Sequence, residues 1–493
     1  YRFREQRRER PGRFGPELPR REGFIGRTVE DRSLSVSARR GARNGRRTPT
    51  VPPGQAHAST RQPEREMTGI LLGAAVLWAS WPLRMTATQF WRQPSTVLLP
   101  AVFAASLVYY LVPAWGLPAF GVCISSAAAL SLLERRRVLA EVGRQSISRK
   151  DRRSVGLLAA LVIWLTARDV AGSGVEPEVV LGLFASLLVL FGLTQSIRHA
   201  AFTARLTTWC SASFLGVALL LGGLTNSEWT DCRPEFDKCS VAGRLYIGVF
   251  NSENALAFLA ALVVALGLGQ RWRRRPVLVL AVIVTIVLTG SRTALVGGAV
   301  ALLALPIIAT TAVRINSQGF RTFRVNRAVA LLGPAFAGSV GLLLGSYVEP
   351  GSLSRRGDVW TEIRQFADVT SLTGIGRGRY VELLDAGYFR GHYPHSQYML
   401  LVAFGGLIAV AIFVAALCSL WASVRCHARA PLAFACAPIV FALAYGWTEL
   451  FWNPVGVDPN IWTVAALLSV AGSRSHDPGP DRTNIVLGAE GRA

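Results

Sequence analysis

The chain has 493 residues, of which 51% are hydrophobic, and its formal net charge is +23. Apolar runs of about 15 to 25 residues recur from Thr68 to Ser473, which excludes a soluble globular protein, and they lack the alternation of an outer-membrane barrel strand. Most of the basic residues are arginines that flank or precede these runs, so the charge indicates membrane topology and argues against nucleic-acid binding.

The first segment, residues 1–66, holds 17 Arg against 8 Asp plus Glu and has almost no apolar periodicity. We predict that this basic segment is disordered. Two other interpretations stay open: a tail that binds anionic lipid headgroups, and a native chain that begins at Met67. The apolar run 68–83 follows. It either crosses the membrane or lies in the interface, because a span there would put the basic segment outside, against the charge rule.

Residues 67–473 form the predicted membrane domain. We predict an all-α fold, a polytopic helical membrane protein with about twelve transmembrane helices, because a spanning helix satisfies all its backbone polar groups internally. The predicted spans are 97–112, 114–133, 155–170, 178–197, 206–224, 245–268, 277–290, 293–312, 328–346, 397–421, 431–450 and 459–472.

Charges in the connections predict the orientation of these spans, since lysine and arginine are retained on the cytoplasmic side. The basic connections are 134–153, 270–276, 314–327 and 425–429, whereas acidic residues outnumber basic ones in 168–178, 225–244 and 451–460. This alternation predicts a multi-pass membrane protein with one large extracytoplasmic loop at 347–397 and a cytoplasmic tail at 474–493.

The seven cysteines are too scattered for a metal cluster, and the sequence has no motif of a metalloprotease, a nucleotide-binding loop or a serine hydrolase. We therefore expect no metal and no cofactor. Cys232 and Cys239 differ from the other cysteines because they share one outward connection. We predict a disulfide between them, and two unpaired thiols are the alternative.

Arg292 is the only charged residue between Val277 and Ala312. An arginine at the centre of a membrane helix costs about 2.5 to 3.5 kcal/mol. A turn at Gly290-Ser291 would let Arg292 reach the outer face. The preceding span is too short for the roughly 30 Å hydrocarbon core, so this turn would be recessed. The sequence thus predicts a recessed cationic pocket, with an arginine that snorkels to the headgroups as the alternative.

More arginines lie in the loop 347–397. Arg356 lies near the start of a predicted amphipathic helix, and Arg377 and Arg379 alternate with the glycines of the segment 374–378, which permit positive φ angles. Guanidinium groups bind phosphate oxygens bidentately, and no pair of closely spaced acidic residues for a divalent metal accompanies them. These arginines therefore suit a pyrophosphate bound without a metal, and ordinary surface ion pairs are the alternative for any one of them.

His395 follows Pro394 and directly precedes an apolar run, so we expect it beside a helix N-terminus. A neutral imidazole there could take a proton from an acceptor hydroxyl, and the helix dipole would oppose the protonated form. His392 is a rival for this role. The structural alternative is a histidine that only caps the helix.

Four motifs occur in order along residues 248–473. They are Gly290-Ser291-Arg292-Thr293, Arg356 with Trp360, Gly374-Ile375-Gly376-Arg377-Gly378, and His395-Ser396-Gln397-Tyr398 ahead of a span that carries Gly405-Gly406. In this order they resemble the O-antigen ligase and O-antigen polymerase superfamily of polytopic membrane glycosyltransferases. Ser396 stands where this family usually has Asn, which leaves any contact of the Asn amide open.

The resemblance implies transfer of a glycan from undecaprenyl pyrophosphate to an acceptor hydroxyl of a glycan or lipid, at the outer face of the membrane, with inversion and without a metal. By position, His395 would be the base that activates the acceptor. Arg292 and Arg356 would hold the pyrophosphate and stabilise its charge on departure, with Arg377 or Arg379 assisting. Polymerase and ligase differ only in the acceptor, and the sequence does not separate them.

A transporter or flippase of a lipid-linked or anionic solute is the alternative function, because an arginine within the membrane is equally natural in such a protein. The spans show no internal two-fold repeat, and a long ordered outer loop is unusual in a rocking carrier. Both features favour the transferase.

Overall fold

The computed structural model describes residues 62–81, 98–112, 118, 121–122, 125, 129, 149–174, 176–196, 200–225, 229–234, 238–250, 252–269, 273–317, 320–389, 394–426, 428–455, 458 and 460–472. Several predicted features lie outside these residues. They are the basic segment up to residue 61, the cytoplasmic tail, His392 and most of the predicted span 114–133.

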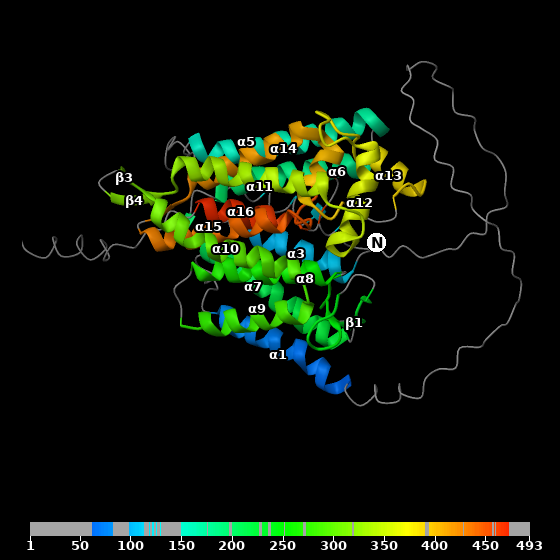
Figure 1. The fold of residues 1–493 in the computed structure, drawn as a ribbon. Helices are drawn as coiled ribbons and strands as arrows, with labels where there is room; N and C mark the ends of the chain where they lie inside the picture. Colours follow the sequence, from blue (N-terminus) through cyan, green and yellow to red (C-terminus); the bar gives the residue numbers. More distant parts are fainter. Residues whose placement is uncertain are drawn as a thin grey trace, which may run out of the picture. The chain divides into compact units, whose positions relative to one another are not determined.

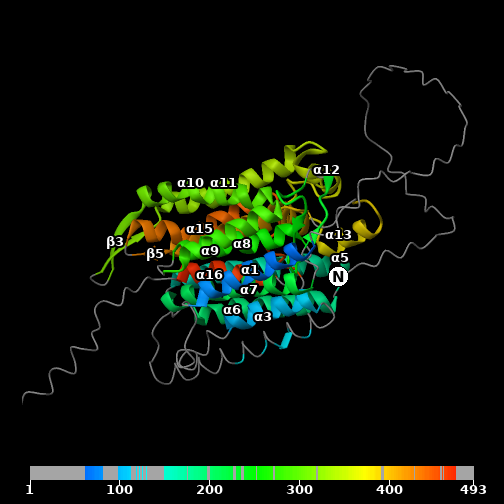
Figure 2. The same cartoon turned by 90° about the horizontal axis from the view of Figure 1, so that it is seen from below.

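The described part is mostly helical. Its helices are α1 (Gln62–Ser80), α3 (Leu98–Leu111), α5 (Arg149–Ser173), α6 (Pro177–Ser196), α7 (Ala200–Thr225), α8 (Glu253–Leu268), α9 (Arg275–Thr289), α10 (Arg292–Thr311), α11 (Arg327–Tyr347), α12 (Ser352–Phe366), α13 (Arg377–Asp385), α14 (Gln397–Ser423), α15 (Arg429–Tyr445) and α16 (Ile461–Gly472). The long helices lie side by side, with α12 and α13 at one end of the bundle and strands β3 (Val313–Ser317) and β4 (Phe320–Arg324) at the other (Figure 1, Figure 2). We call these the α12 end and the β3 end.

Five helices of the described part are long and apolar enough to cross a membrane, namely α5, α7, α10, α11 and α14. Shorter apolar helices accompany them. Large apolar side chains on the outer helices face away from the protein: Leu302 and Leu303 on α10, and Leu332 and Phe336 on α11, are between 58% and 71% exposed. Contiguous apolar surface of this kind is typical of contact with lipid, so this part of the chain is a helical, membrane-embedded protein.

Helix α1 packs lengthwise against α7 and α9 and belongs to the bundle. A Cβ on Gly73 would stand 2.6 Å from the carbonyl oxygen of Gly216, so the two backbones approach closely, as small residues allow in membranes. Near the other end of α1, Arg274 donates to the carbonyl oxygen of Trp78 at 3.0 Å. The N-terminus of α1 lies toward the α12 end (Figure 1, Figure 2). This packing favours a span over an interfacial helix for the run 68–83.

Helix α1 begins earlier than predicted. Residues 62–66 are helical, so the segment predicted as disordered up to residue 66 is wrong in its last five residues. Pro63 is tolerated there because the N–H groups of the first helical turn have no partner within the helix.

Helix α8 begins later than predicted, at Glu253 and not at residue 245. Leu245 and Tyr246 form strand β2 instead. Ser252 then caps α8, since its hydroxyl accepts from the N–H of Asn254 at 3.1 Å. The predicted start at residue 245 depends on apolar composition alone. Composition does not distinguish a short buried strand from a helix, because both are apolar.

Two small antiparallel sheets, which the all-α prediction did not include, lie within this mostly helical fold. Strand β1 (Trp229–Thr230) pairs with β2 (Leu245–Tyr246), and the β3–β4 hairpin is joined by β5 (Arg425–Cys426). These strands lie in connections between helices. The charge of a connection predicts the side of the membrane on which it lies, but it does not predict the backbone conformation. The charge pattern therefore does not predict these strands.

Helix α14 is interrupted at Gly406, where φ is +67° and ψ is −165°. The N–H groups of Leu407 and Ile408 lose their helical partners and donate to the carbonyl oxygens of Ser371 and Leu372, at 2.9 and 3.2 Å. A membrane-embedded backbone must be satisfied within the protein, and the loop segment supplies the missing acceptors.

The glycine-rich segment 374–378 starts in this break and continues into α13. Gly374 and Gly376 have positive φ angles, as predicted, whereas Gly378 lies within α13. A Cβ on Gly374 would stand 2.6 Å from the carbonyl oxygen of Val402, so only glycine permits this approach.

Candidate active site

The predicted turn between two apolar helices is present at Gly290 and Ser291. Gly290 ends α9 in the left-handed region, with φ at +64°. Ser291 is buried and caps α10, accepting from the N–H of Ala294 at 3.5 Å. Arg292 is the first residue of α10 and is exposed. A Cβ on Gly290 would stand 3.1 Å from the carbonyl oxygen of Cys239, so the turn packs on the 229–246 connection.

A buried carboxylate, Glu449, lies where this turn, α12 and the start of α14 meet. Its Oε1 accepts from Nδ2 of Asn254 at 2.6 Å and from the guanidinium of Arg356. Asn254 in turn accepts from the hydroxyl of Ser291 at 2.9 Å. Arg356 is buried along with Glu449. We call Asn254, Ser291, Arg356, His395 and Glu449 the Glu449 cluster.

His395 reaches the same carboxylate from the start of α14. Its Nδ1 lies 3.7 Å from Oε2 of Glu449, and 41% of its side chain is exposed. Its φ of +48° is rare for a residue other than glycine. The indole N–H of Trp360 donates to the carbonyl oxygen of Pro394, directly before it. Arg356 and Trp360, one turn apart on α12, thus hold the carboxylate and the chain that presents the imidazole.

Ser396 caps α14. Its hydroxyl accepts from the N–H of Met399 at 3.3 Å and donates to the carbonyl oxygen of Gly446 at 3.2 Å. The backbone N–H of Gln397 donates to the same carbonyl oxygen at 2.9 Å, which ties the start of α14 to the end of α15. Serine and asparagine are both preferred N-cap residues, so serine at this position keeps the cap without the amide.

The pKa of Glu449 lies below its usual value. Burial raises this pKa, but the charge of Arg356, the nearby imidazole of His395 and the charge of Lys238 together outweigh burial. The carboxyl group is therefore ionised at neutral pH. An ionised carboxylate beside Nδ1 favours the tautomer with the proton on Nδ1, which leaves Nε2 free to accept a proton.

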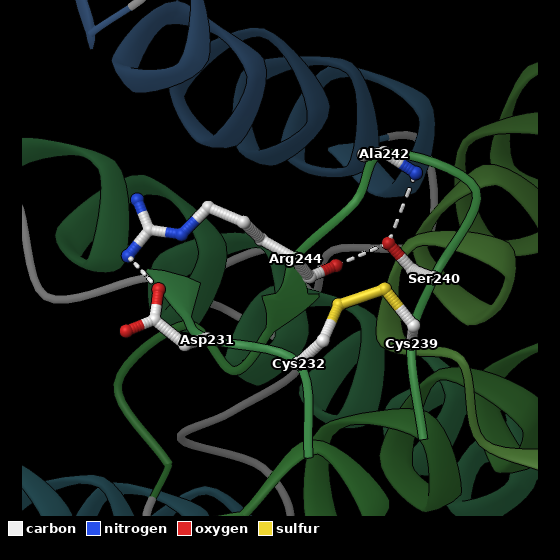
Figure 3. Close-up of a disulfide and its surroundings, with 6 residues drawn as sticks. All are labelled: Asp231, Cys232, Cys239, Ser240, Ala242 and Arg244. Carbon is white, nitrogen blue, oxygen red and sulfur yellow. Dashed lines mark hydrogen bonds and ion pairs between the residues drawn. A yellow bond between two sulfur atoms is a disulfide. The ribbon is translucent and has the colours of Figure 1, made fainter. Parts of the chain in front are cut away.

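A second buried carboxylate, Glu253, begins α8. Nζ of Lys238 lies 2.8 Å from its Oε1, and a guanidinium nitrogen of Arg233 lies 3.9 Å from its Oε2. Both cations belong to a loop that a disulfide closes. This disulfide joins Cys232 and Cys239, as predicted (Figure 3). The disulfide loop therefore supplies positive charge next to the Glu449 cluster.

Arg377 and Arg379 lie on α13, which packs against α5 and α14. The described contacts of both are outside the Glu449 cluster. Arg379 pairs with Glu382 at 2.7 Å on an exposed surface, and Arg377 lies 3.9 Å from Glu176. Arg379 thus fits the alternative of an ordinary surface ion pair, and the structure does not bring either arginine to His395 by a described contact.

Glu449, Glu253 and Asn254 connect the cluster, yet none of them belongs to a motif that the sequence predicts as functional. Each glutamate is the only charged residue in a long apolar stretch, residues 431–457 and 245–269. The same signal drew attention to Arg292, so it could have found both. Asn254 has no such signal, because spacing does not distinguish a buried amide from an exposed one.

The cluster combines a partly exposed imidazole, an ionised carboxylate behind it and one arginine, Arg356, beside that carboxylate. Nε of Arg356 is buried and has no hydrogen-bond partner among the described residues, so this guanidinium keeps an unused donor. Such a set can accept a proton and bind an anion in one place. No model of a protein family, no curated protein and no solved structure matches this chain.

Proposed function

We propose that the chain is a membrane glycosyltransferase that moves a glycan from undecaprenyl pyrophosphate to an acceptor hydroxyl at the outer face of the cytoplasmic membrane. The observation that carries the proposal is the meeting of three motif regions around Glu449. Arg356 of α12 and His395 at the start of α14 face the carboxylate directly, and the turn before Arg292 reaches it through Asn254. These regions are far apart along the chain. Their meeting at one carboxylate supports the resemblance to the O-antigen ligase and polymerase superfamily independently of their order in the sequence.

In this proposal His395 is the general base. Glu449 accepts from Nδ1–H, and Nε2 takes the proton of the acceptor hydroxyl. The acceptor oxygen attacks the anomeric carbon on the side opposite to the pyrophosphate. As the new C–O bond forms, the bond to the pyrophosphate oxygen breaks, its electron pair leaves with the pyrophosphate, and the anomeric configuration inverts. Arg292 and Arg356 stabilise the negative charge that develops on the leaving group.

The proposal assigns the α12 end to the outer face and the β3 end to the cytoplasm. The described parts of the basic connections 270–276, 314–327 and 425–429 lie at the β3 end, and those of 225–244 and 451–460 lie at the α12 end, which supports this orientation (Figure 1). The partners are then a lipid-linked glycan donor, a glycan or lipid acceptor, and membrane lipid. If α1 is counted as a span, the predicted number of spans rises from about twelve to about thirteen, and α1 begins at the outer face.

The test is product formation by purified protein in detergent, with an undecaprenyl-pyrophosphate-linked oligosaccharide as donor. We expect transfer by the wild type and a loss of at least about 100-fold in His395→Ala and in Arg292→Ala, because each removes a group that stabilises the transition state. Arg379→Ala is the matched control: it removes an exposed arginine of α13 and is expected to leave transfer unchanged. Full activity in the first two variants, with normal membrane insertion, would overturn the assignment.

A transporter or flippase is the second candidate, and one observation favours it. Helix α14 is discontinuous at Gly406, and interrupted helices form the substrate sites of many transporters. Here, however, backbone of residues 371–375 fills the break. The detergent assay separates the two functions, because no gradient exists there: a transferase makes product and a carrier does not.

A further inference from the structure

The disulfide loop carries a cation into the interior of the α12 end. Lys238 directly precedes Cys239, and its side chain is only 17% exposed. The backbones of Arg233 and Lys238 pair with each other through hydrogen bonds of 2.8 and 3.0 Å. The disulfide between Cys232 and Cys239 and this backbone pair close the loop at Lys238 and at the residue after it, and so restrict the direction of the Lys238 side chain.

Lys238 is the main neutralising partner of Glu253. The Glu253 side chain is 2% exposed, and its Oε2 has no hydrogen-bond partner among the described residues. Arg233 is the other cation near it, but its side chain is 41% exposed and 3.9 Å away. A buried carboxylate without a close cation is strongly destabilised, so removal of the ammonium group would favour a displacement of Glu253 from its present position.

Glu253 is adjacent to Asn254 in the first turn of α8. Asn254 donates to Glu449 and accepts from Ser291, so a shift of this turn changes the hydrogen bond that orients Glu449. The loop also reaches the cluster by a second route, because the carbonyl oxygen of Cys239 packs on the turn before Arg292.

We propose that Lys238 is a positioning residue for the transfer reaction and that the Cys232–Cys239 disulfide holds it in place. Lys238 acts through Glu253 and Asn254: by neutralising the buried carboxylate it keeps the first turn of α8 where Asn254 supports Glu449. The proposal rests on the transferase function given above. It makes transfer dependent on an oxidising compartment at the α12 end, where such a disulfide persists.

The test uses the same detergent assay with Lys238→Met, Glu253→Gln and the double variant. Lys238→Met leaves Glu253 unpaired, and we expect kcat to fall about 10-fold or more with little change in KM for the donor. The double variant removes both charges and is expected to recover most of the activity. Lys238→Arg keeps the positive charge and should therefore retain most of the activity. A lysine that only contributed to folding would lower the amount of folded protein and leave the kcat of the folded fraction unchanged.

Asp231→Asn is the matched control for this loop. Asp231 is 92% exposed and pairs with Arg244 at 3.2 Å, and Figure 3 shows this pair extending away from the disulfide. Its loss removes an ion pair of the same loop without touching Glu253. We expect wild-type kcat and KM.

The disulfide is tested by Cys232→Ser together with Cys239→Ser, and by reduction of the wild type with a phosphine. Both are expected to lower kcat by a factor similar to that of Lys238→Met. In the Lys238→Met background the two serines should have no further effect, because changes that act through one contact are not additive.

Three outcomes would overturn the role of Lys238 in an active enzyme: unchanged transfer in Lys238→Met, a double variant as inactive as the single one, or losses from the serines that add to that of Lys238→Met. Absence of transfer by the wild type is a different result. It would contradict the proposed function itself, and the inference with it.

Discussion

Glu449 receives polar contacts from three elements that are far apart in the sequence. One carboxylate oxygen faces Asn254 on α8 and Arg356 on α12, and the other faces His395 before α14. His395 is 41% exposed, whereas the Glu449 side chain is 7% exposed. Glu449 can therefore orient the imidazole without touching the substrate, so we regard it as a positioning residue.

Substitution of Glu449 by glutamine tests this role. The amide has nearly the same shape but carries no charge and offers an N–H, so it no longer favours the tautomer with the proton on Nδ1. We expect kcat to fall by about 10² to 10⁴-fold with a small change in KM, as loss of the orienting carboxylate does in other histidine-dependent enzymes. Transfer by the purified variant is the measurement. Glu382→Gln, an exposed glutamate of α13, is the control. Equal activity of both variants would contradict the role.

Single residues were predictable from the sequence where an isolated charge or a glycine made them unusual. Arg292 is such a charge, and the turn before it is present. Glu449 has the same signal but lay inside the predicted span 431–450, where a helix was expected to continue. The helix ends at Tyr445, and the turn that follows folds the carboxylate inward. Only the tertiary structure shows that Arg379 is a surface ion pair.

At the scale of elements, the break in α14 organises the loop at the α12 end. Arg168 on α5 donates to the carbonyl oxygens of Thr373 and Gly374, each at 3.1 Å. The indole N–H of Trp164 donates to the carbonyl oxygen of Gly405 at 2.9 Å. Helix α5 thus holds both the interrupted helix and the segment that fills the break.

Alanine at position 406 tests how much the fold depends on this break. Gly406 has a positive φ, and a Cβ there would stand 2.3 Å from the carbonyl carbon of Leu372. We expect Gly406→Ala to destabilise the protein by at least about 2 kcal/mol, seen as a lower melting temperature in detergent. Gly298→Ala is the control, because a Cβ at that helical position meets nothing within 4 Å. It should be neutral or stabilise by about 0.5 to 1 kcal/mol. Equal melting temperatures would show that the break tolerates a side chain.

Most apolar spans were predictable because a helix in lipid needs a long run of apolar residues. The starts of α8 and α1, the short strands and the filled break were not. Each depends on partners that are distant in the sequence: strand β1 for Tyr246, α7 for α1, and the carbonyl oxygens of Ser371 and Leu372 for α14. Composition and periodicity contain no information about such partners.

At the scale of the whole molecule, the account requires the α12 end and the β3 end to face opposite sides of the membrane. Asp385 on α13 and Arg314 on β3 are exposed residues at these two ends. Cys210, Cys418, Cys426 and Cys436 are free cysteines of the described part and are buried, so these four should label weakly.

We expect Asp385→Cys to react with a membrane-impermeant maleimide in intact cells. Arg314→Cys should react only after the membrane is permeabilised. The physical reason is the retention of arginine-rich connections in the cytoplasm during insertion. The reverse pattern of labelling would invert the proposed orientation and put His395 on the wrong side for an extracytoplasmic transfer.

The central claim is that Arg292, Arg356 and His395 serve one pyrophosphate-linked substrate. The most direct measurement is an experimental structure of the protein with an undecaprenyl-pyrophosphate-linked oligosaccharide bound to the His395→Ala variant. We expect the pyrophosphate at the α12 end in contact with the guanidinium groups of Arg292 and Arg356, and the anomeric carbon facing the position of the missing imidazole. A pyrophosphate bound at the β3 end, or at the α12 end without either arginine, would contradict the account.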